Sequence, residues 1–423
     1  MLRRIAEFGP LFSGRAGWFP RTGALSLAIL SALPVLASPK ISRSDQLLLN
    51  AALKGDEKRV WQLLSKGAHV DVRNDNLDTP LILAAWKGWT SVVGVLLNGG
   101  ADPNAHNHSG QTPLHWAAAG GNRELMEVLI EKRAELDSKD DGSSTPLMWA
   151  ISNNRPAAAE LLVGRGADVN IRQKGGSTPL ILAAANDNQL ILSLLLDKGA
   201  DVNARNDEGR TSLLAAAAGG HTEIVKLLLA RNVEVHSKDK LGNTALRLAV
   251  VKDATATVEL LLGRNADVNV PNNEGETPLM AASSVKMVDL LLGSGAAINA
   301  TNQYGETAFT FAGFRSKKEV AEYLTSKGAT GPVGVTEMPR LIRAVEPEYT
   351  EVARQAKLQG TVILRVVVNT EGRATNIRVA KSLGYGLDEQ AIRAVQKWQF
   401  RPSARNGRVA DFEATIEVNF RLL

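Results

Sequence analysis

Thr79-Pro80-Leu81 recurs along the chain at a fixed interval. Full or degenerate copies follow at steps of 33 residues, and the last copy comes after a step of 30. The copies are Thr112-Pro113-Leu114, Thr145-Pro146-Leu147, Thr178-Pro179-Leu180, Thr211-Ser212-Leu213, Thr244-Ala245-Leu246, Thr277-Pro278-Leu279 and Thr307-Ala308-Phe309. A period of this length is typical of stacked helix pairs, none of which can bury its apolar face alone. The pattern therefore predicts an all-α solenoid over about two thirds of the chain.

A single copy shows why a helix begins at each tripeptide. Gly110 suits a tight turn that needs a positive φ, and Thr112 is a residue type that caps helices. Pro113 stands at the first helical position, where its missing N–H costs no hydrogen bond. A leucine-rich second helix follows, and a glycine such as Gly199 ends it. Each unit is therefore expected to be two helices followed by a turn into a β-hairpin tip.

The tripeptide, the Ala-Ala pair after it and a later Gly-Ala-Asp, as at Gly100 and Gly166, resemble the ankyrin-repeat family. The resemblance covers residues 44–330 in about eight units. The first unit, which opens at Asp45, is more polar and is expected to cap the stack. The unit near residues 281–284 is three residues short, and we expect a bend there. The resemblance implies protein binding through hairpin tips and inner helices, without catalysis.

Composition narrows the function further. The chain has 423 residues, a formal net charge of +5 and no cysteine, which excludes disulfides, thiolate metal sites and cysteine nucleophiles. Residues 38–330 show no basic excess, which argues against a nucleic-acid groove, because phosphate binding needs clustered Lys and Arg. No nucleophile–base pair or phosphate-binding loop is recognisable in the sequence. We therefore expect neither an enzyme nor a cofactor-binding protein.

Three histidines, His106, His108 and His115, are close enough in sequence to be considered as metal ligands. The ankyrin resemblance places His115, like His221, at a position that makes structural hydrogen bonds. His106 and His108 fall on a loop that is expected to be exposed. We therefore predict no metal site.

Two tryptophans are candidates for a partner-binding surface. Trp86 aligns with small residues of other repeats at a partly exposed position, and Trp89 stands where ankyrin repeats usually carry histidine. An exposed aromatic pair suits a binding anchor, and the alternative is packing on the first repeat. Trp116 and Trp149 stand where other units have leucine, and they are interpreted as core residues.

The N-terminus has the pattern of an export signal. Four arginines precede an apolar run over residues 24–37, which ends in small residues suited to cleavage before Ser38. The run is shorter than the roughly 20 residues of a membrane span. Residues 1–37 are therefore predicted to be a signal peptide, with an uncleaved inner-membrane anchor as the alternative. Either reading places the rest of the chain in the periplasm or cell envelope.

The 33-residue repeats stop near residue 330. A linker over residues 331–340 then leads to a second domain over residues 341–423. The pattern predicts a helix over Thr350–Leu358, strands over 361–369 and 374–381, a helix from Leu387 and a last strand over Phe412–Arg421. In that strand the inward residues are expected to be Phe412, Ala414, Ile416, Val418 and Phe420, and the outward residues Glu413, Thr415, Glu417, Asn419 and Arg421. The expected fold is a small α+β domain with helices on one face of an antiparallel sheet.

Several landmarks of this domain resemble the C-terminal domain of the TonB energy transducers. They are Pro347-x-Tyr349, Gly360-Thr361-Val362, Glu371-Gly372-Arg373, Leu387-Asp388-x-x-Ala391, Trp398-x-Phe400-Arg401-Pro402 and Gly407-Arg408-Val409. One departure is Thr350, where the family usually has a second proline. The resemblance implies capture of an extended segment of an outer-membrane receptor, which joins the open sheet edge as a strand. The candidate contacts are Tyr349 and the last-strand residues Phe412, Glu413, Ala414, Thr415, Ile416, Glu417, Val418 and Asn419.

A TonB transducer also has a membrane anchor and a Pro-rich spacer, and here the ankyrin units stand in the place of the spacer. The leading interpretation is an exported protein-binding protein whose ankyrin stack is both spacer and second binding surface. Energy-coupled transport follows only if the N-terminus stays in the membrane. The alternative is a periplasmic scaffold that docks to a receptor or to the cell wall without transducing energy.

Overall fold

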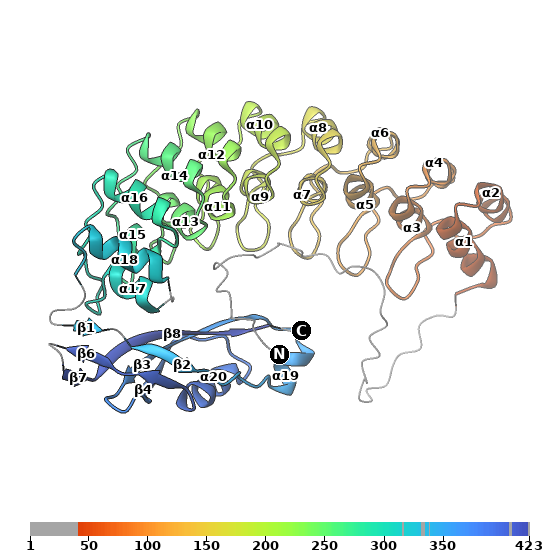
Figure 1. The fold of residues 1–423 in the computed structure, drawn as a ribbon. Coiled ribbons are helices and arrows are strands. Elements are labelled where there is room, and N and C mark those ends of the chain that lie inside the picture. The colour runs from red at the N-terminus through yellow and green to blue at the C-terminus, as the bar shows by residue number, and fades with distance from the viewer. Residues whose placement is uncertain (1–40, 315–316, 331–334, 338, 406–407, 422–423) are drawn as a thin grey trace. The chain divides into compact units, whose positions relative to one another are not determined.

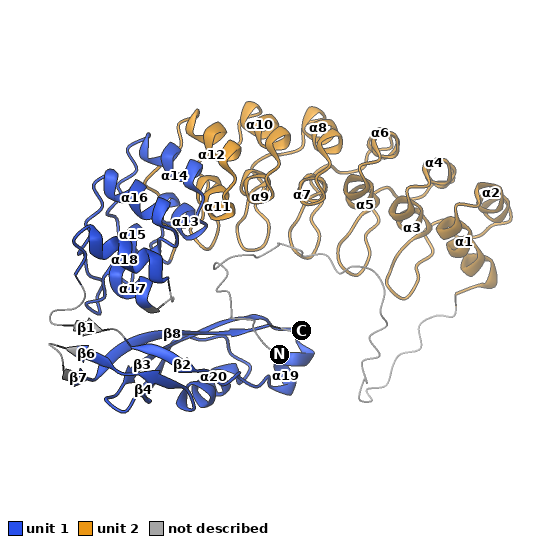
Figure 2. Cartoon of the chain, in the orientation of Figure 1, with its two compact units in different colours: residues 1–10, 241–423 blue, residues 11–240 orange. Residues whose placement is uncertain are grey.

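The computed structural model describes residues 41–421 except 315–316, 331–334, 338 and 406–407. The predicted signal segment, residues 1–37, lies outside the described residues. The described chain divides after Lys240 into two compact units (Figure 2). None of the helices in the described ranges is long and apolar enough to be a membrane span.

The unit that ends at Lys240 is built of helix pairs (Figure 1). The helices are α1 Arg43–Lys54, α2 Glu57–Ser65, α3 Pro80–Lys87, α4 Thr90–Asn98, α5 Pro113–Gly120, α6 Arg123–Glu131, α7 Pro146–Ser152, α8 Pro156–Gly164, α9 Pro179–Ala185, α10 Gln189–Asp197, α11 Ser212–Gly219 and α12 Thr222–Leu229. Odd-numbered helices pack on odd-numbered neighbours and even-numbered helices on even-numbered ones. Each pair therefore forms one layer of a two-row stack.

The tripeptide begins the first helix of each layer after the first, as predicted. The side chain of Thr79 accepts a hydrogen bond from the Ile82 amide at 3.3 Å, and Pro80 follows at the first helical position. The helix ends at Gly88, whose φ of 76° requires a residue that tolerates the left-handed region. The leucine of the tripeptide is the core residue of each layer, with exposed fractions of 0–1% at Leu81, Leu114, Leu147, Leu180 and Leu213.

The second unit continues with three more helix pairs and ends in the C-terminal domain. Its helices are α13 Ala245–Val251, α14 Thr255–Leu262, α15 Pro278–Ala281, α16 Val285–Gly293, α17 Ala308–Phe314 and α18 Lys318–Ser326. The described residues thus hold nine helix pairs, and the expected count of eight was one too low. Eight copies of the tripeptide follow the polar first pair, α1 and α2, so the sequence itself holds nine units. The short unit loses its residues from α15, which has only 4 residues.

The C-terminal domain contains three sheets, whereas the sequence pattern predicts one. The elements are β1 Val335–Glu337, β2 Arg340–Arg343, α19 Glu351–Gln355, β3 Gly360–Val368, β4 Ala374–Lys381, α20 Leu387–Gln396, β5 Gln399–Arg401, β6 Ser403–Arg405, β7 Arg408–Ala410 and β8 Phe412–Phe420. The main sheet has the order β4-β3-β8, and the small ones pair β1-β6-β7 and β2-β5. Helix α20 packs on β3 and β4 and covers one face of the main sheet. The predicted α+β arrangement is confirmed, with short strands added.

Candidate functional site

The candidate site is the free edge of strand β8. Antiparallel pairing joins it to β3 without interruption, from Phe412 opposite Val368 to Phe420 opposite Gly360. Among the described residues no strand pairs with its other side. Every second residue of an edge strand directs its backbone N–H and C=O away from the sheet, so this edge offers a row of hydrogen-bonding groups.

The side chains of β8 alternate as predicted. The inward residues Phe412, Ala414, Ile416, Val418 and Phe420 are all buried. Of the outward residues, Glu413 and Asn419 are exposed, whereas Thr415 and Glu417 are half-buried. The inward set packs against β3 and the helices, so the strand is held firmly on one face and its free backbone edge is presented by a rigid element.

Tyr349 lies at the end of this strand and has a packing role. Its ring meets that of Phe420 edge to face, with centroids 5.5 Å apart. Its hydroxyl donates to the Leu358 carbonyl at 3.0 Å, and burial raises the pKa of the Tyr349 phenol. The residue thus supports the end of the edge strand, and a direct contact with a partner stays a prediction.

Two of the sequence landmarks contact each other, the turn between β3 and β4 and the segment that contains β5. Gly372 has a φ of 76°, and a Cβ placed there would lie 2.0 Å from the Phe400 carbonyl oxygen. The Phe400 amide donates to the Gly372 carbonyl at 2.8 Å, which ties the two segments together. The Trp398 indole N–H donates to the Val345 carbonyl at 2.8 Å. These motifs therefore build the domain around the edge strand.

The ankyrin-side candidates differ from each other. Trp86 is 43% exposed, and the Lys87 ammonium lies 3.9 Å from the centroid of its ring. Trp89 is 42% exposed but packs over Gly55, and its indole N–H donates to the Leu53 carbonyl at 3.2 Å. The corresponding residue of a later repeat, His221, makes the same kind of bond between repeats. Trp89 therefore helps to join the first two layers, whereas Trp86 has the freer surface.

The residues interpreted as core are covered to different degrees. Trp149 is 4% exposed and donates to Asp140 at 2.9 Å, whereas Trp116 is half-buried. Trp116 contacts both neighbouring rings, with centroids 6.0 Å from Trp86 and 5.1 Å from Trp149. The tryptophans of α3, α5 and α7 thus form a continuous aromatic row that ends at the exposed ring of Trp86.

The polar clusters of the repeats have structural partners. His115 is buried, its Nδ1 lies 3.1 Å from the Thr112 amide and its Nε2 lies 3.0 Å from the Ser144 carbonyl oxygen. Burial lowers the pKa of the His115 imidazole, which keeps it neutral in this role. Within the described ranges no group of three or more potential metal ligands comes together.

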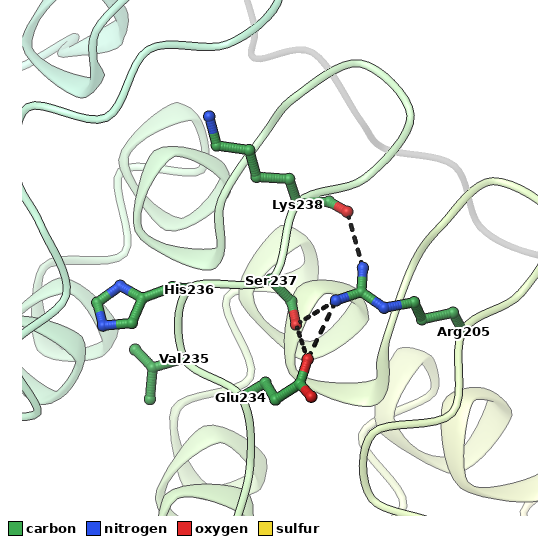
Figure 3. A pocket seen from close by; sticks show the side chains of 6 residues that line it. All are labelled: Arg205, Glu234, Val235, His236, Ser237 and Lys238. Carbon is green, nitrogen blue, oxygen red and sulfur yellow. Dashed lines mark hydrogen bonds and ion pairs between the residues drawn. The ribbon is translucent and has the colours of Figure 1, made fainter.

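A shallow hollow lies at the hairpin tip before Lys240 (Figure 3). The Arg205 guanidinium fills its polar side, with contacts of 3.1 Å to Glu234, 2.8 Å to the Ser237 hydroxyl and 3.1 Å to the Lys238 carbonyl oxygen. Val235 and His236 line the remainder. The arginine thus joins one hairpin tip to the next.

Sequence reasoning missed two residues beside the site, Glu306 and Arg365. Glu306, in the turn before α17, is 4% exposed and contacts the outward face of the β3–β8 ladder through Arg365 and Thr415. Neither Glu306 nor Arg365 is among the candidate site residues that the sequence predicts. The contact joins positions far apart in sequence, so no local pattern could have shown it.

Comparisons with known proteins agree with both parts of the chain. The model of ankyrin repeats in sets of three copies matches overlapping segments that together run from residue 48 to residue 334. The model of the Gram-negative bacterial TonB protein C-terminal region matches residues 345–422.

Individual relatives match the C-terminal region alone. The chain is 38% identical over 77 residues to Protein tonB2 of Pseudomonas aeruginosa, which is 18% of this chain and 28% of that protein. It is 42% identical over 77 residues to Protein TonB of Xanthomonas campestris pv. campestris, 18% of this chain and 34% of that protein. It is 28% identical over 99 residues to Protein TonB of Vibrio cholerae, 23% of this chain and 41% of that protein. The chain thus spans well under half the length of these relatives.

Proposed function

Because this chain belongs to the ankyrin-repeat family and ends in a TonB-type C-terminal domain, we propose that it captures an extended protein segment by strand addition at β8. The observation that carries the proposal is the uninterrupted ladder of β3 and β8, whose outer edge no described strand covers. An incoming strand would form backbone hydrogen bonds there, and side chains at alternate positions would select the partner.

The partner that fits this mode is an extended segment of a TonB-dependent outer-membrane receptor. A strand of 9 residues at roughly 3.3 Å each is long enough to pair with a short receptor segment along its whole length. The outward carboxylates Glu413 and Glu417 keep two copies of the same edge apart, because like charges would face each other. The strand is therefore suited to a foreign segment rather than to self-pairing.

The ankyrin repeats are proposed to serve as spacer and as a second protein-binding surface. Each layer between the first and the last packs through a buried leucine of the tripeptide, which favours a stack that keeps its length. Trp86 is the candidate anchor of the second surface, because its ring is exposed while the aromatic row behind it is held in place.

The strand-addition proposal is tested by a pair of neighbouring proline variants, Ile416→Pro and Glu417→Pro. Of two successive residues in a regular strand, one directs its N–H to β3 and the other to the free edge. We expect one variant to lose the C-terminal fold, and the other to stay folded and lose pull-down of receptor-segment peptides. If the variant that stays folded binds these peptides like the wild type, the proposal is overturned.

A second candidate function is a periplasmic scaffold that docks to a receptor or to the cell wall without transducing energy. The two functions differ in what becomes of the N-terminal apolar run over residues 24–37. N-terminal sequencing of protein from fractionated cell envelopes separates them. A chain that retains this run in the inner-membrane fraction supports the transducer, and a soluble chain that begins at Ser38 supports the scaffold.

A further inference from the structure

The turn before α17 is built to hold one carboxylate in a fixed place. The Asn302 side-chain oxygen accepts from the amides of Tyr304 at 2.9 Å and Glu306 at 3.0 Å. The Asn302 side-chain nitrogen donates to Oε2 of Glu306 at 2.7 Å. These bonds fix the carboxylate inside its own turn and leave Oε1 for a contact outside it.

That second oxygen contacts the C-terminal sheet. The Thr415 hydroxyl donates to Oε1 of Glu306 at 3.2 Å, and Nη1 of Arg365 lies 3.8 Å from the same oxygen. The Arg365 guanidinium also stacks on the Tyr304 ring, 2.9 Å from its centroid. Arg365 and Thr415 are directly opposite each other on β3 and β8, so Glu306 contacts both members of one cross-strand pair.

The preceding repeat shows the same turn with a different cation. Glu276 stands at the position equivalent to Glu306, its carboxylate accepts from Asn272 at 3.0 Å, and it pairs with Arg247 of the repeat before it. The residue equivalent to Arg247 for the last turn is Met280, which carries no charge. The last repeat therefore lacks the repeat-derived cation, and Arg365 of the C-terminal sheet stands in its place.

We propose that Glu306 and Tyr304 form a docking site for the C-terminal sheet. In this site Arg365 takes the place that Arg247 has beside Glu276 in the preceding turn. We call this set of four residues, Tyr304, Glu306, Arg365 and Thr415, the latch. The latch makes the sheet the next layer after the last repeat. It holds the ladder that carries the free edge of β8 against the repeat.

Burial makes the loss of one partner of this contact more costly than it would be in a surface ion pair. The side chains of Glu306 and Arg365 are 5% and 12% exposed, and Nε and Nη1 of Arg365 make no hydrogen bond among the described residues. If the carboxylate were lost, a buried guanidinium would remain uncompensated, which costs far more than breaking an exposed pair. The two parts are therefore expected to stay docked in solution.

Docking is tested in the full-length chain without any peptide. We compare Arg365→Met, which keeps an unbranched stem but removes the charged guanidinium, with the milder Thr415→Val and the control Thr361→Val. Thr361 lies on β3 and its hydroxyl donates to Asn419 at 2.6 Å, within the sheet. The readout is amide hydrogen exchange of residues 302–307, in the repeat that carries none of these substitutions.

The latch predicts roughly tenfold faster exchange of residues 302–307 in Arg365→Met, a smaller rise in Thr415→Val and none in Thr361→Val. Amides of Leu364 and Val366 report whether the sheet itself is still folded. If Arg365→Met unfolds it, Thr415→Val decides, because this variant removes only the hydroxyl contact with Glu306 and leaves the reporter segment unaltered. Unchanged exchange at 302–307 in the folded variants would overturn the dock.

The consequence for binding rests on the proposed function and is measured separately. A docked ladder is preorganised for strand addition, so the folded latch variants should bind receptor-segment peptides more weakly than the Thr361→Val control. Equal affinity would overturn this consequence while the exchange data still decide the dock. Absence of peptide binding by the wild type would instead contradict the function proposed for β8.

Discussion

Oε1 of Glu306 lies 3.2 Å from the Thr415 hydroxyl, although 109 positions separate the two residues in sequence. The bond joins the last ankyrin turn to the strand that is proposed to receive a partner. Through this bond the last repeat contacts β8, the strand whose free edge is the candidate site. The last ankyrin turn is thus in contact with the sheet that carries this edge.

The charge state of Glu306 predicts how the latch responds to pH. Desolvation raises the pKa of the Glu306 carboxyl above its ordinary value of 4.5, against the opposing effects of Asn302, Arg365 and Thr415, while Glu276 adds to the rise. The folded state therefore binds this proton more tightly than the unfolded state does. The resulting stability is present below pH 4.5 and is lost as the pH rises through the raised pKa.

The measurement is the melting temperature of the wild type and of Glu306→Gln, which cannot titrate, at several pH values from 4.5 upward. We expect the wild type to lose stability relative to the variant as the pH rises across this range. A wild type that gains stability over the variant in the same range would mean that the Arg365 pairing outweighs desolvation.

A matched pair of leucines tests the packing of the repeats. Leu147 is fully buried, so Leu147→Ala should lower the free energy of unfolding by about 2–5 kcal/mol. Leu190 is 75% exposed on a helix of the next layer, and Leu190→Ala should change the same quantity by less than about 0.5 kcal/mol. Urea unfolding followed by circular dichroism gives both values. Similar losses from both variants would be inconsistent with the two-row stack.

The two exposed tryptophans are expected to respond differently to truncation. Trp86→Ala should leave the melting temperature nearly unchanged and weaken an ankyrin-side partner by about 2 kcal/mol, since its ring is free to serve as an anchor. Trp89→Ala should destabilise the first layers by roughly 0.5–3 kcal/mol, because it loses the contacts with Gly55 and Leu53. Thermal melts and binding to the same partner separate these effects. A large loss of stability in Trp86→Ala would make it a packing residue.

The elements that the sequence predicted well are those whose signals are local. Thr79 and Pro80 define a helix start by their own chemistry, and the alternation from Phe412 to Phe420 defines a strand with one buried face. The helix expected over Thr350–Leu358 is shorter in the structure, Glu351–Gln355, because Lys357 already has a φ of 50°. The sequence thus predicted that a helix forms here, but not the residue at which it ends.

The features that the sequence did not show depend on contacts between distant segments. Strands such as β5 and β6 have 3 residues each, too few for alternation to be recognised. The latch needs Arg365 to meet a turn in another domain, and its only trace in the sequence is Met280 where the preceding repeat has Arg247. The meaning of Met280 becomes clear only when the structure shows that Arg247, at the equivalent position, pairs with Glu276.

Strand addition at β8 is tested most directly by amide exchange along this strand in the full-length protein, with and without a receptor-segment peptide. An added strand would bond only to the N–H groups of the free edge, so every second amide from Phe412 to Phe420 should become protected. The amides of β4, at the opposite edge of the sheet, should be unchanged. Protection confined to β4, or an unchanged pattern along β8 under conditions in which the peptide binds, would contradict the account.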